Sequence, residues 1–154
     1  MAKRTVRRSR DGTFQLKITD EERDLVASLA TQLRELLTSE QPEGVERLFP
    51  PGYANDEERE KEYQLITHDE LLGKRLASVD VLERTVTQSS LTQDELNAWM
   101  GAVNDLRLVL GTRLDVTEDM DEISLDDPRA PAFAVYQYLT YLLSEIVQAL
   151  AADL

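Results

Sequence analysis

One stretch, residues 91–114, constrains the fold of this chain more than any other. It reads LTQDELNAWMGAVNDLRLVLGTRL. It opens on the capping box Thr92-Gln93-Asp94-Glu95, in which the Thr and Glu side chains satisfy free amides at a helix start. Leu91 and Leu96 flank the box at the positions of a hydrophobic staple. More than five turns with apolar side chains over half the circumference follow, which predicts a central helix surrounded by other helices.

Other segments carry weaker helical patterns. A second capping box, Thr19-Asp20-Glu21-Glu22, predicts a helix over residues 20–38. From Asn55 the chain is acidic and helical, and a third T-x-x-E sequence occurs at residues 67–70. That sequence either caps a new helix or is passed without interruption, and we favour a break or kink there. Asp127-Pro128 or Pro131 begins a last helix that continues to about residue 150.

A β-hairpin is expected before the first helix. TVRRSR and TFQLKI flank Asp11-Gly12, a dipeptide that suits a two-residue type I′ turn. The sequence therefore predicts a mostly α fold, a four- to five-helix bundle with a short N-terminal β-hairpin. We expect a single domain over residues 1–154, with a basic arm and hairpin at 1–18, a helical bundle at 19–154 and an acidic loop at 115–127.

Composition narrows the class of protein. A chain of 154 residues buries roughly 70% of its unfolded surface, enough for one core. No apolar run approaches the roughly 20 residues of a membrane helix, and no apolar region follows the basic N-terminus as in a secretory signal. There is no cysteine, which excludes disulfides, thiolate metal sites and thiol nucleophiles. We expect a cytoplasmic protein without cofactors.

Charge is distributed unevenly. Residues 1–17 hold six basic residues and one acid, a charge of +5, so the other 137 residues carry −18 of the total −13. An acidic body repels nucleic-acid phosphate, so we expect direct DNA binding to be weak or absent. The basic arm is a candidate for contact with an acidic partner, or locally with DNA, through Arg4, Arg7, Arg8 and Arg10. The alternative is that these charges serve solubility alone.

Catalytic constellations are weak throughout the sequence. His68 is the only histidine, and its neighbour Asp69 is poorly placed for a dyad because adjacent helical residues do not face each other. Glu58, Glu62 and Asp69 lack the Glu-x-x-His motifs of a di-metal bundle. The acidic loop lacks the ligand pattern and central glycine of an EF-hand. We expect no catalytic residue, no metal and no enzyme activity.

Polar residues beside the apolar face of the central helix form a second candidate group. An unpaired guanidinium is costly to bury, so Arg107 and Arg113 should reach solvent or pair with a carboxylate. Asn104 and Asp105 are the local partners. We favour a structural network that fixes helix register. The alternative is a small-ligand or enzyme pocket that adds Trp99 and a tyrosine of the last helix, Tyr136. Gly101 and Gly111 predict close approach of a neighbouring backbone.

The pattern W-x₄-N-x₂-R-L-x-L-G-x-R-L, from Trp99 to Leu114, resembles a family of small helical proteins of actinobacteria, long without a known function, that includes the oxidative-stress transcriptional regulator AosR. The segment LFP-P-x-Y-x-x-D, the E-x-E-Y step ending at Tyr63 and the tyrosines of the last helix are also similar. The resemblance extends over nearly the whole chain.

This resemblance implies an intracellular, non-enzymatic regulator that contacts the transcription machinery, a sigma factor or RNA polymerase. Because family members commonly lie near the gene of a Clp protease adaptor, an adaptor role in proteolysis is an alternative. A regulator that senses oxidation through thiols would need cysteine, so redox sensing here must be indirect or use Met100 or Met120. Broad apolar faces on the last helix, with Phe133, Tyr138 and Tyr141, favour a homodimer.

Overall fold

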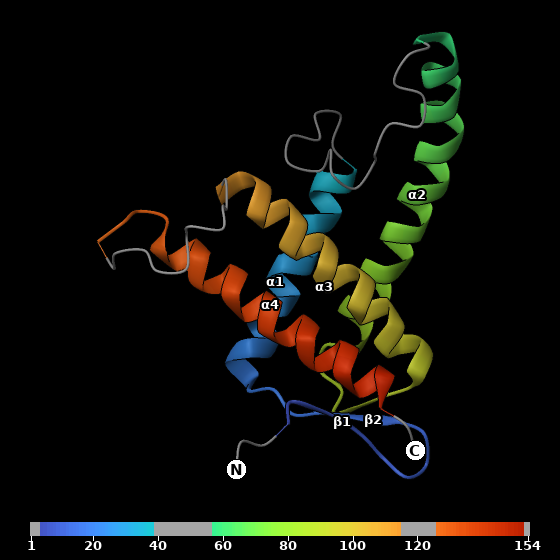
Figure 1. Cartoon of the computed structure of the whole chain (residues 1–154). Helices are drawn as coiled ribbons and strands as arrows, with labels where there is room; N and C mark the ends of the chain where they lie inside the picture. The colour runs from blue at the N-terminus through green and yellow to red at the C-terminus, as the bar shows by residue number, and fades with distance from the viewer. Residues whose placement is uncertain (1–3, 39–56, 115–125, 153–154) are drawn as a thin grey trace.

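The computed structural model describes residues 4–38, 57–114 and 126–152, and for residues 57–68 it describes the backbone alone. This part of the chain is mostly α-helical and carries one small sheet, as the sequence predicts (Figure 1). The helices are α1 (Asp20–Leu37), α2 (Glu57–Thr85), α3 (Gln93–Leu114) and α4 (Ala130–Ala151). The strands are β1 (Val6–Arg8), β2 (Phe14–Leu16) and β3 (Ser90–Leu91).

Helix α3 is the central helix, which confirms the main prediction from the sequence. It packs against α4, α2 and α1, and α3 and α4 run side by side in Figure 1. Leu96, Trp99 and Val103 have no exposed surface. One core cluster contains buried apolar side chains from each of the four helices and three strands. The long, wide apolar face of α3 is therefore the reason that this helix lies at the centre of the bundle.

The sheet closes one end of the helical layer (Figure 1). Its strand order is β1-β2-β3 and both pairs are antiparallel, with Val6 opposite Leu16 and Phe14 opposite Leu91. These four side chains are buried, so one face of the sheet belongs to the core. The sequence does not predict β3, because Leu91 is read there only as part of the helix start.

The hairpin turn differs from the prediction. Gly12 N donates to Ser9 O at 3.2 Å and Ser9 N donates to Thr13 O at 2.7 Å. The turn therefore spans Ser9 to Gly12, and Gly12, its last residue, has φ +88°. This is the three-residue loop in which a type I turn is followed by a left-handed glycine, not the two-residue type I′ turn. Asp11 stabilises the loop by accepting hydrogen bonds from the amide and hydroxyl of Thr13.

The two predicted capping boxes are present and differ in detail. At the start of α3, Glu95 N donates to Thr92 Oγ1 at 3.1 Å and Thr92 N donates to Glu95 Oε1 at 2.8 Å, so the box is complete. At the start of α1, Glu22 N donates to Thr19 Oγ1, but the Glu22 carboxylate accepts from the Thr19 hydroxyl instead of the Thr19 amide. Its other oxygen accepts from the Tyr138 hydroxyl at 2.8 Å, which ties α4 to this helix start.

Helix α2 passes through residues 67–70 without interruption, so the predicted break or kink is wrong. A capping box requires its first residue to leave the helical conformation. The preceding Gln64, Leu65 and Ile66 supply no glycine or proline that would end a helix, so the chain continues through Thr67. The upper turns of α2 extend past the other helices in Figure 1.

Helix α4 begins at Ala130, with Pro131 in its first turn, close to the predicted start. Asp127 organises the approach, because its carboxylate accepts from the Arg129 amide at 2.8 Å and pairs with the Arg129 guanidinium at 2.9 Å. These hydrogen bonds lower the pKa of Asp127. The remainder of the predicted acidic loop, residues 115–125, lies outside the described residues, as does the predicted short turn near Leu48 and Phe49.

The sequence predicts that a neighbouring backbone approaches Gly101 and Gly111, and this prediction is wrong: only side-chain atoms lie near them. A Cβ at Gly101 would meet only Ser78 Oγ, at 3.5 Å. A Cβ at Gly111 would lie 3.1 Å from Cε2 of Tyr136, so at this position the absence of a side chain admits an aromatic ring from α4. Only Gly111 therefore has a packing role.

Candidate functional site

Trp99 is a core residue. It is fully buried, and its indole Nε1 donates to Thr85 Oγ1 at 2.7 Å. The Thr85 hydroxyl, also fully buried, donates in turn to the Val81 carbonyl at 2.7 Å. Both polar groups are therefore paired within the helix layer, and the indole fastens α3 to the end of α2. This side chain lines no accessible pocket in the part of the chain that the structure describes.

Asp105 pairs with an arginine that the sequence did not single out. Arg75 of α2 approaches through Nη1, which lies 2.8 Å from Asp105 Oδ1, and the Asp105 side chain is only 1% exposed. Asp105 Oδ2 and Arg75 Nε are buried with no hydrogen-bond partner. Burial raises the pKa of Asp105 to about 6, although the charge and hydrogen bond of Arg75 act in the opposite direction. This pair joins α2 to α3, and it is not the pairing of Asp105 with Arg107 or Arg113 that the sequence indicates.

Arg107 is not part of that ion pair. Its Nε donates to Thr140 Oγ1 at 2.9 Å, and its guanidinium lies 5.3 Å from the centre of the Tyr136 ring. It therefore contacts α4. The sequence indicated Asn104 and Asp105 as its partners, and Arg107 pairs with neither. Asn104 is half-buried beside it on α3. The contact joins α3 to α4, as Arg75 joins α2 to α3.

Arg113 is exposed at the last turn of α3 and lines a small apolar hollow of about 50 Å³ between α1 and α3. Trp99 precedes it by fourteen residues, which places the two about 21 Å apart along the helix axis. The pocket proposed from Trp99, Arg107, Arg113 and Tyr136 is therefore not formed: these residues lie in three separate environments. The structure supports the structural interpretation of this group.

Two further arginines of α1 hold the bundle together and were missed from the sequence. Arg23 Nη1 donates to the carbonyls of Val86 and Gln88, at 2.6 and 2.8 Å, and Nη2 donates to the Leu16 carbonyl at 3.3 Å. A single guanidinium thus joins α1 to β2 and to the connection that follows α2. Nothing in the local sequence marks it, because its acceptors are backbone carbonyls of distant segments.

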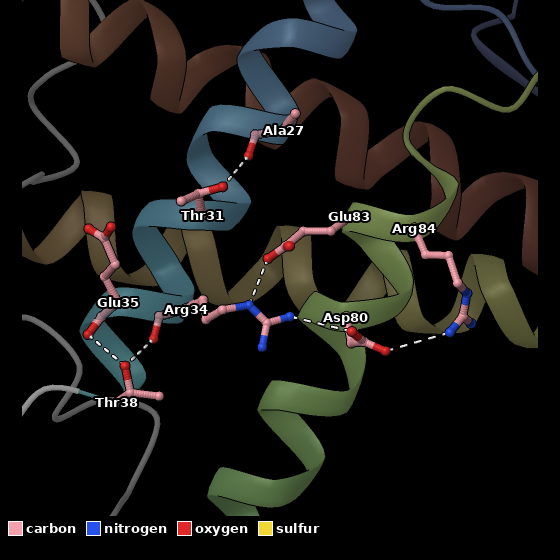
Figure 2. Close-up of polar contacts among 8 residues, drawn as sticks. All are labelled: Ala27, Thr31, Arg34, Glu35, Thr38, Asp80, Glu83 and Arg84. Atoms are coloured by element: carbon pink, nitrogen blue, oxygen red, sulfur yellow. Dashed lines mark hydrogen bonds and ion pairs between the residues drawn. The ribbon is translucent and has the colours of Figure 1, made fainter.

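Figure 2 shows the second one, Arg34. Its Nε donates to Glu83 Oε1 at 2.9 Å, and its Nη2 lies 3.6 Å from Asp80 Oδ1 on the next turn of α2. Asp80 in turn lies 3.5 Å from Arg84. These side chains are partly or largely exposed, so the pairs contribute little free energy each and mainly fix how α1 lies on α2.

The basic arm lies at the other end of the molecule, where β1 meets the end of α4. Arg4, Arg7 and Arg10 are exposed and Arg8 is half-buried. Together they line a hollow of about 280 Å³ with Val6, Ser9, Ala149 and Ala152. Of all the candidate residues, these four are the ones that the fold gathers on one accessible surface. The structure thus brings together the group that charge alone had indicated.

Other expectations meet different outcomes. The His68 side chain lies outside the described part, but its backbone lies within α2 and not at a helix start.

The aromatic residues of α4 contact other parts of the same chain. Phe133 is buried and the Tyr138 hydroxyl donates a hydrogen bond to Glu22, so both serve packing within the chain. Tyr141 is 49% exposed and its hydroxyl pairs with that of Thr5 at 2.8 Å. Within the described ranges, no helix is both long and apolar enough to cross a membrane.

These features define a class of protein: a small, centrally packed helical bundle that is closed at one end by a three-stranded sheet. Among the described side chains, no three His, Asp or Glu gather as metal ligands would. The chain belongs to the family described as "Domain of unknown function (DUF2017)", whose model matches residues 3–150. No solved structure matches the chain significantly.

Curated relatives are similar over about half of the chain. The "Putative oxidative stress regulator AosR" of Mycobacterium leprae is 40% identical over 75 residues, which is 48% of this chain and 35% of that protein. The "Oxidative stress regulator AosR" of Mycobacterium tuberculosis is 37% identical over 79 residues, 49% of this chain and 36% of that protein. The protein of the same name from Mycobacterium bovis shows the same values. The matched region is thus about a third of each relative's length.

Proposed function

We propose that this protein is a non-enzymatic regulator of transcription or of the stress response, and that it acts by contacting a sigma factor or RNA polymerase. The observation that carries the proposal is the similarity to proteins named oxidative stress regulators, at 37–40% identity over about half of the chain. Because the match covers about a third of those relatives, their activity is extended to this chain only as part of this proposal.

The charge arrangement supports action through protein contact. The hairpin arginines lie on one surface at the end of α4, while the rest of the chain is strongly acidic. An acidic body offers complementary surface to the basic regions of proteins that bind nucleic acid, and complementary charge raises association rates and selects partners. The internal arginines Arg23, Arg75 and Arg107 are used in packing contacts, so this function would reside on the exterior.

Any response to oxidants would be indirect within these 154 residues, because they contain no cysteine. Met100 is half-buried and packs against the core of the bundle, so its oxidation would disturb packing before it changed a surface. The regulator would in this case follow the state of its partner.

Crosslinking mass spectrometry in cells that produce the protein naturally tests this proposal, with the intact chain carrying an affinity tag. We expect crosslinks to a sigma factor or to an RNA polymerase subunit. An Arg7→Gln/Arg10→Gln variant should lose the crosslinks that involve the hairpin and keep those of the acidic body. Arg84→Gln, which removes one positive charge from an exposed position of α2, is the control for loss of charge elsewhere.

Two results would contradict the proposal. Crosslinks to Clp components without any transcription component would favour the adaptor role in proteolysis. Recovery of bulk DNA with the purified protein, resistant to moderate salt, would contradict the expectation that the acidic body prevents direct DNA binding.

A further inference from the structure

The hollow at the end of α4 lies along the free edge of β1. The residues that line it from the hairpin are Arg4, Val6, Arg7, Arg8, Ser9 and Arg10, and none comes from β2. Strand β1 is an edge strand, because the sheet order is β1-β2-β3. The other wall is the last turn of α4, through Ala149 and Ala152. Two small side chains on that wall leave room for a ligand between the helix end and the strand.

Arg8 forms the fixed base of this site. Its guanidinium lies 4.9 Å from the centre of the Phe14 ring, and its Nη2 donates to the Leu150 carbonyl at 3.2 Å. The carbonyl end of a helix carries partial negative charge that would repel an anion, and a cation placed there offsets it. Its Nε is buried without a hydrogen-bond partner, so the present contacts use only part of the donor capacity of Arg8.

The other three arginines are available to a ligand. The side chains of Arg4, Arg7 and Arg10 are exposed and form no ion pair or hydrogen bond with any other described residue. Two acids of adjoining segments already have partners: Glu145 accepts from the Thr5 amide at 2.8 Å, and Asp11 accepts from the Thr13 hydroxyl. Four arginine residues therefore border one hollow, in a chain whose other residues carry a strong net negative charge.

Size and charge together indicate the ligand. A volume of about 280 Å³ is near the lower end of the range of small-molecule pockets, and it exceeds what a bare ion requires. Guanidinium groups match the oxygen geometry of phosphate through paired hydrogen bonds. We propose that this hollow binds the phosphate group of a small phosphorylated molecule. This site shares Arg7 and Arg10 with the hairpin contact tested by crosslinking, but it concerns a small ligand, whereas the proposed function concerns a protein partner.

A small ligand fits the charge distribution better than a macromolecular polyanion does. A DNA duplex would bring many phosphates toward the acidic body, where the repulsion grows with each added charge. A single phosphate or diphosphate group can enter the hollow and meet only the arginines. An acidic protein segment carries single carboxylate charges, each matched by one arginine, and would leave several cations unneutralised.

Nuclear magnetic resonance titration of the full chain tests the proposal directly. The signals to follow are the Nε–Hε groups of the arginines and the backbone amides of residues 6–10 and 149–152. Inorganic phosphate and adenosine diphosphate are added separately, with chloride at equal ionic strength as the reference. We expect saturable shifts confined to these residues with both phosphate compounds. Tighter binding of the diphosphate would assign the site to phosphate esters, and equal affinity would assign it to free phosphate.

The diagnostic variant is Arg7→Gln/Arg10→Gln, because neither side chain contributes to the described packing. Its affinity for phosphate should fall by at least about tenfold, since hydrogen bonds between charged groups are the stronger class. Arg84→Gln removes one positive charge from α2, half the change of the double variant, and should bind as the wild type does. Arg8 is left unchanged, because its contacts with Phe14 and Leu150 support the fold.

Three outcomes would overturn the proposal. Shifts of equal size with chloride would indicate general screening of charge. Unchanged affinity in Arg7→Gln/Arg10→Gln would place the anion elsewhere. Saturation by a glutamate-rich peptide or by duplex DNA, without saturation by the phosphate compounds, would assign the surface to a macromolecule. The phosphate site can fail in each of these ways while crosslinks to transcription proteins persist, and the reverse also holds.

Discussion

Two polar contacts join α3 to α2 inside this bundle, and they are built in opposite ways. The Trp99 indole donates to Thr85, which donates to Val81, so this neutral chain of groups is fully paired. The Arg75–Asp105 pair is charged, and it leaves Asp105 Oδ2 and Arg75 Nε buried without partners. Both contacts fix the same pair of helices, but only one depends on ionisation.

The comparison shows what a buried charge adds and what it costs. A neutral hydrogen bond contributes a modest free energy that is the same at every ordinary pH. A buried carboxylate must lose its hydration, and its partner restores that loss only in part. The raised pKa of Asp105, about 6, expresses this deficit. The stabilisation of the α2–α3 interface by the Trp99 hydrogen bond is therefore independent of pH, whereas the stabilisation by Asp105 depends on pH.

The largest effect should follow from removal of the cation. Arg75→Met keeps the length of the stem and leaves the Asp105 carboxyl group buried without its partner; breaking a fully buried ion pair costs about 3–5 kcal/mol. We expect about 2–3 kcal/mol, because the Arg75 side chain is 29% exposed and the Asp105 carboxyl group, whose pKa is already about 6, can take up a proton once the cation is gone. Urea unfolding at neutral pH measures the change. Arg84→Met, which breaks only an exposed pair with Asp80, should cost less than about 1 kcal/mol.

The destabilisation caused by Arg75→Met should itself depend on pH. Arg75 lowers the pKa of Asp105, so its removal should raise that pKa further. The loss caused by Arg75→Met should then be smaller at about pH 5 than at pH 7, because a protonated Asp105 has no charge to pair. A cost that is equal at the two pH values would show that Asp105 is not the group affected.

The second effect is the pH dependence carried by Asp105 itself. Its pKa is about 6 in the folded chain against an ordinary 3.8, so between these values the folded state holds a proton that the unfolded state has released. The free energy of unfolding that this group contributes is therefore present below about pH 4 and falls as pH rises through 6. The expected loss is about 2–3 kcal/mol.

Asp105→Asn isolates this contribution from those of the other acids. The difference in unfolding free energy between wild type and this variant, from urea titrations at several pH values, should move against the wild type between about pH 4 and 7. Two parallel curves across that range would mean that the pKa of Asp105 is close to that of an ordinary aspartate.

The third prediction concerns loss of the neutral hydrogen bond between Trp99 and Thr85. Thr85→Val keeps the shape of the side chain and removes the acceptor of the Trp99 N–H, which stays buried. An unpaired buried donor costs about 1–3 kcal/mol. Because no ionisable group takes part, the cost should be the same at pH 5 and pH 7 in urea unfolding. A cost that varies with pH would contradict the separation of the two contacts.

The sequence predicts this scaffold better than it predicts the contacts. The Thr92 box and the apolar face of α3 are local signals, and both are confirmed. The residues at 67–70 form the same T-x-x-E motif but lie within α2, because the chain before them remains helical. Strand β3 is two residues long and depends on pairing with β2, which no local pattern encodes.

Pairing across helices is where sequence reasoning failed. Asp105 lies two residues from Arg107, and their nearness in sequence suggested a pair. Residues separated by two do not face each other on a helix, and Arg75 reaches the carboxylate from α2, thirty positions earlier. Arg107 turns to Tyr136 and Thr140 instead. The hairpin arginines stand out in the sequence because their charge contrasts with that of the whole chain; that they bind a partner stays a prediction.

The smallest expected effect concerns the two glycines of α3: Gly101 lies between Trp99 and Asp105, and Gly111 lies six residues after Asp105. Gly101→Ala adds a methyl at ordinary distance from Ser78 Oγ and gains helix propensity, so it should stabilise the chain by up to about 1 kcal/mol. At Gly111 the same gain is opposed, because the methyl would lie 3.1 Å from the Tyr136 ring that also stacks under Arg107. Gly111→Ala should be neutral or destabilising by about 1 kcal/mol. Thermal unfolding of both variants beside the wild type measures the difference, and a stabilisation of equal size at both positions would show that α4 yields freely at Tyr136.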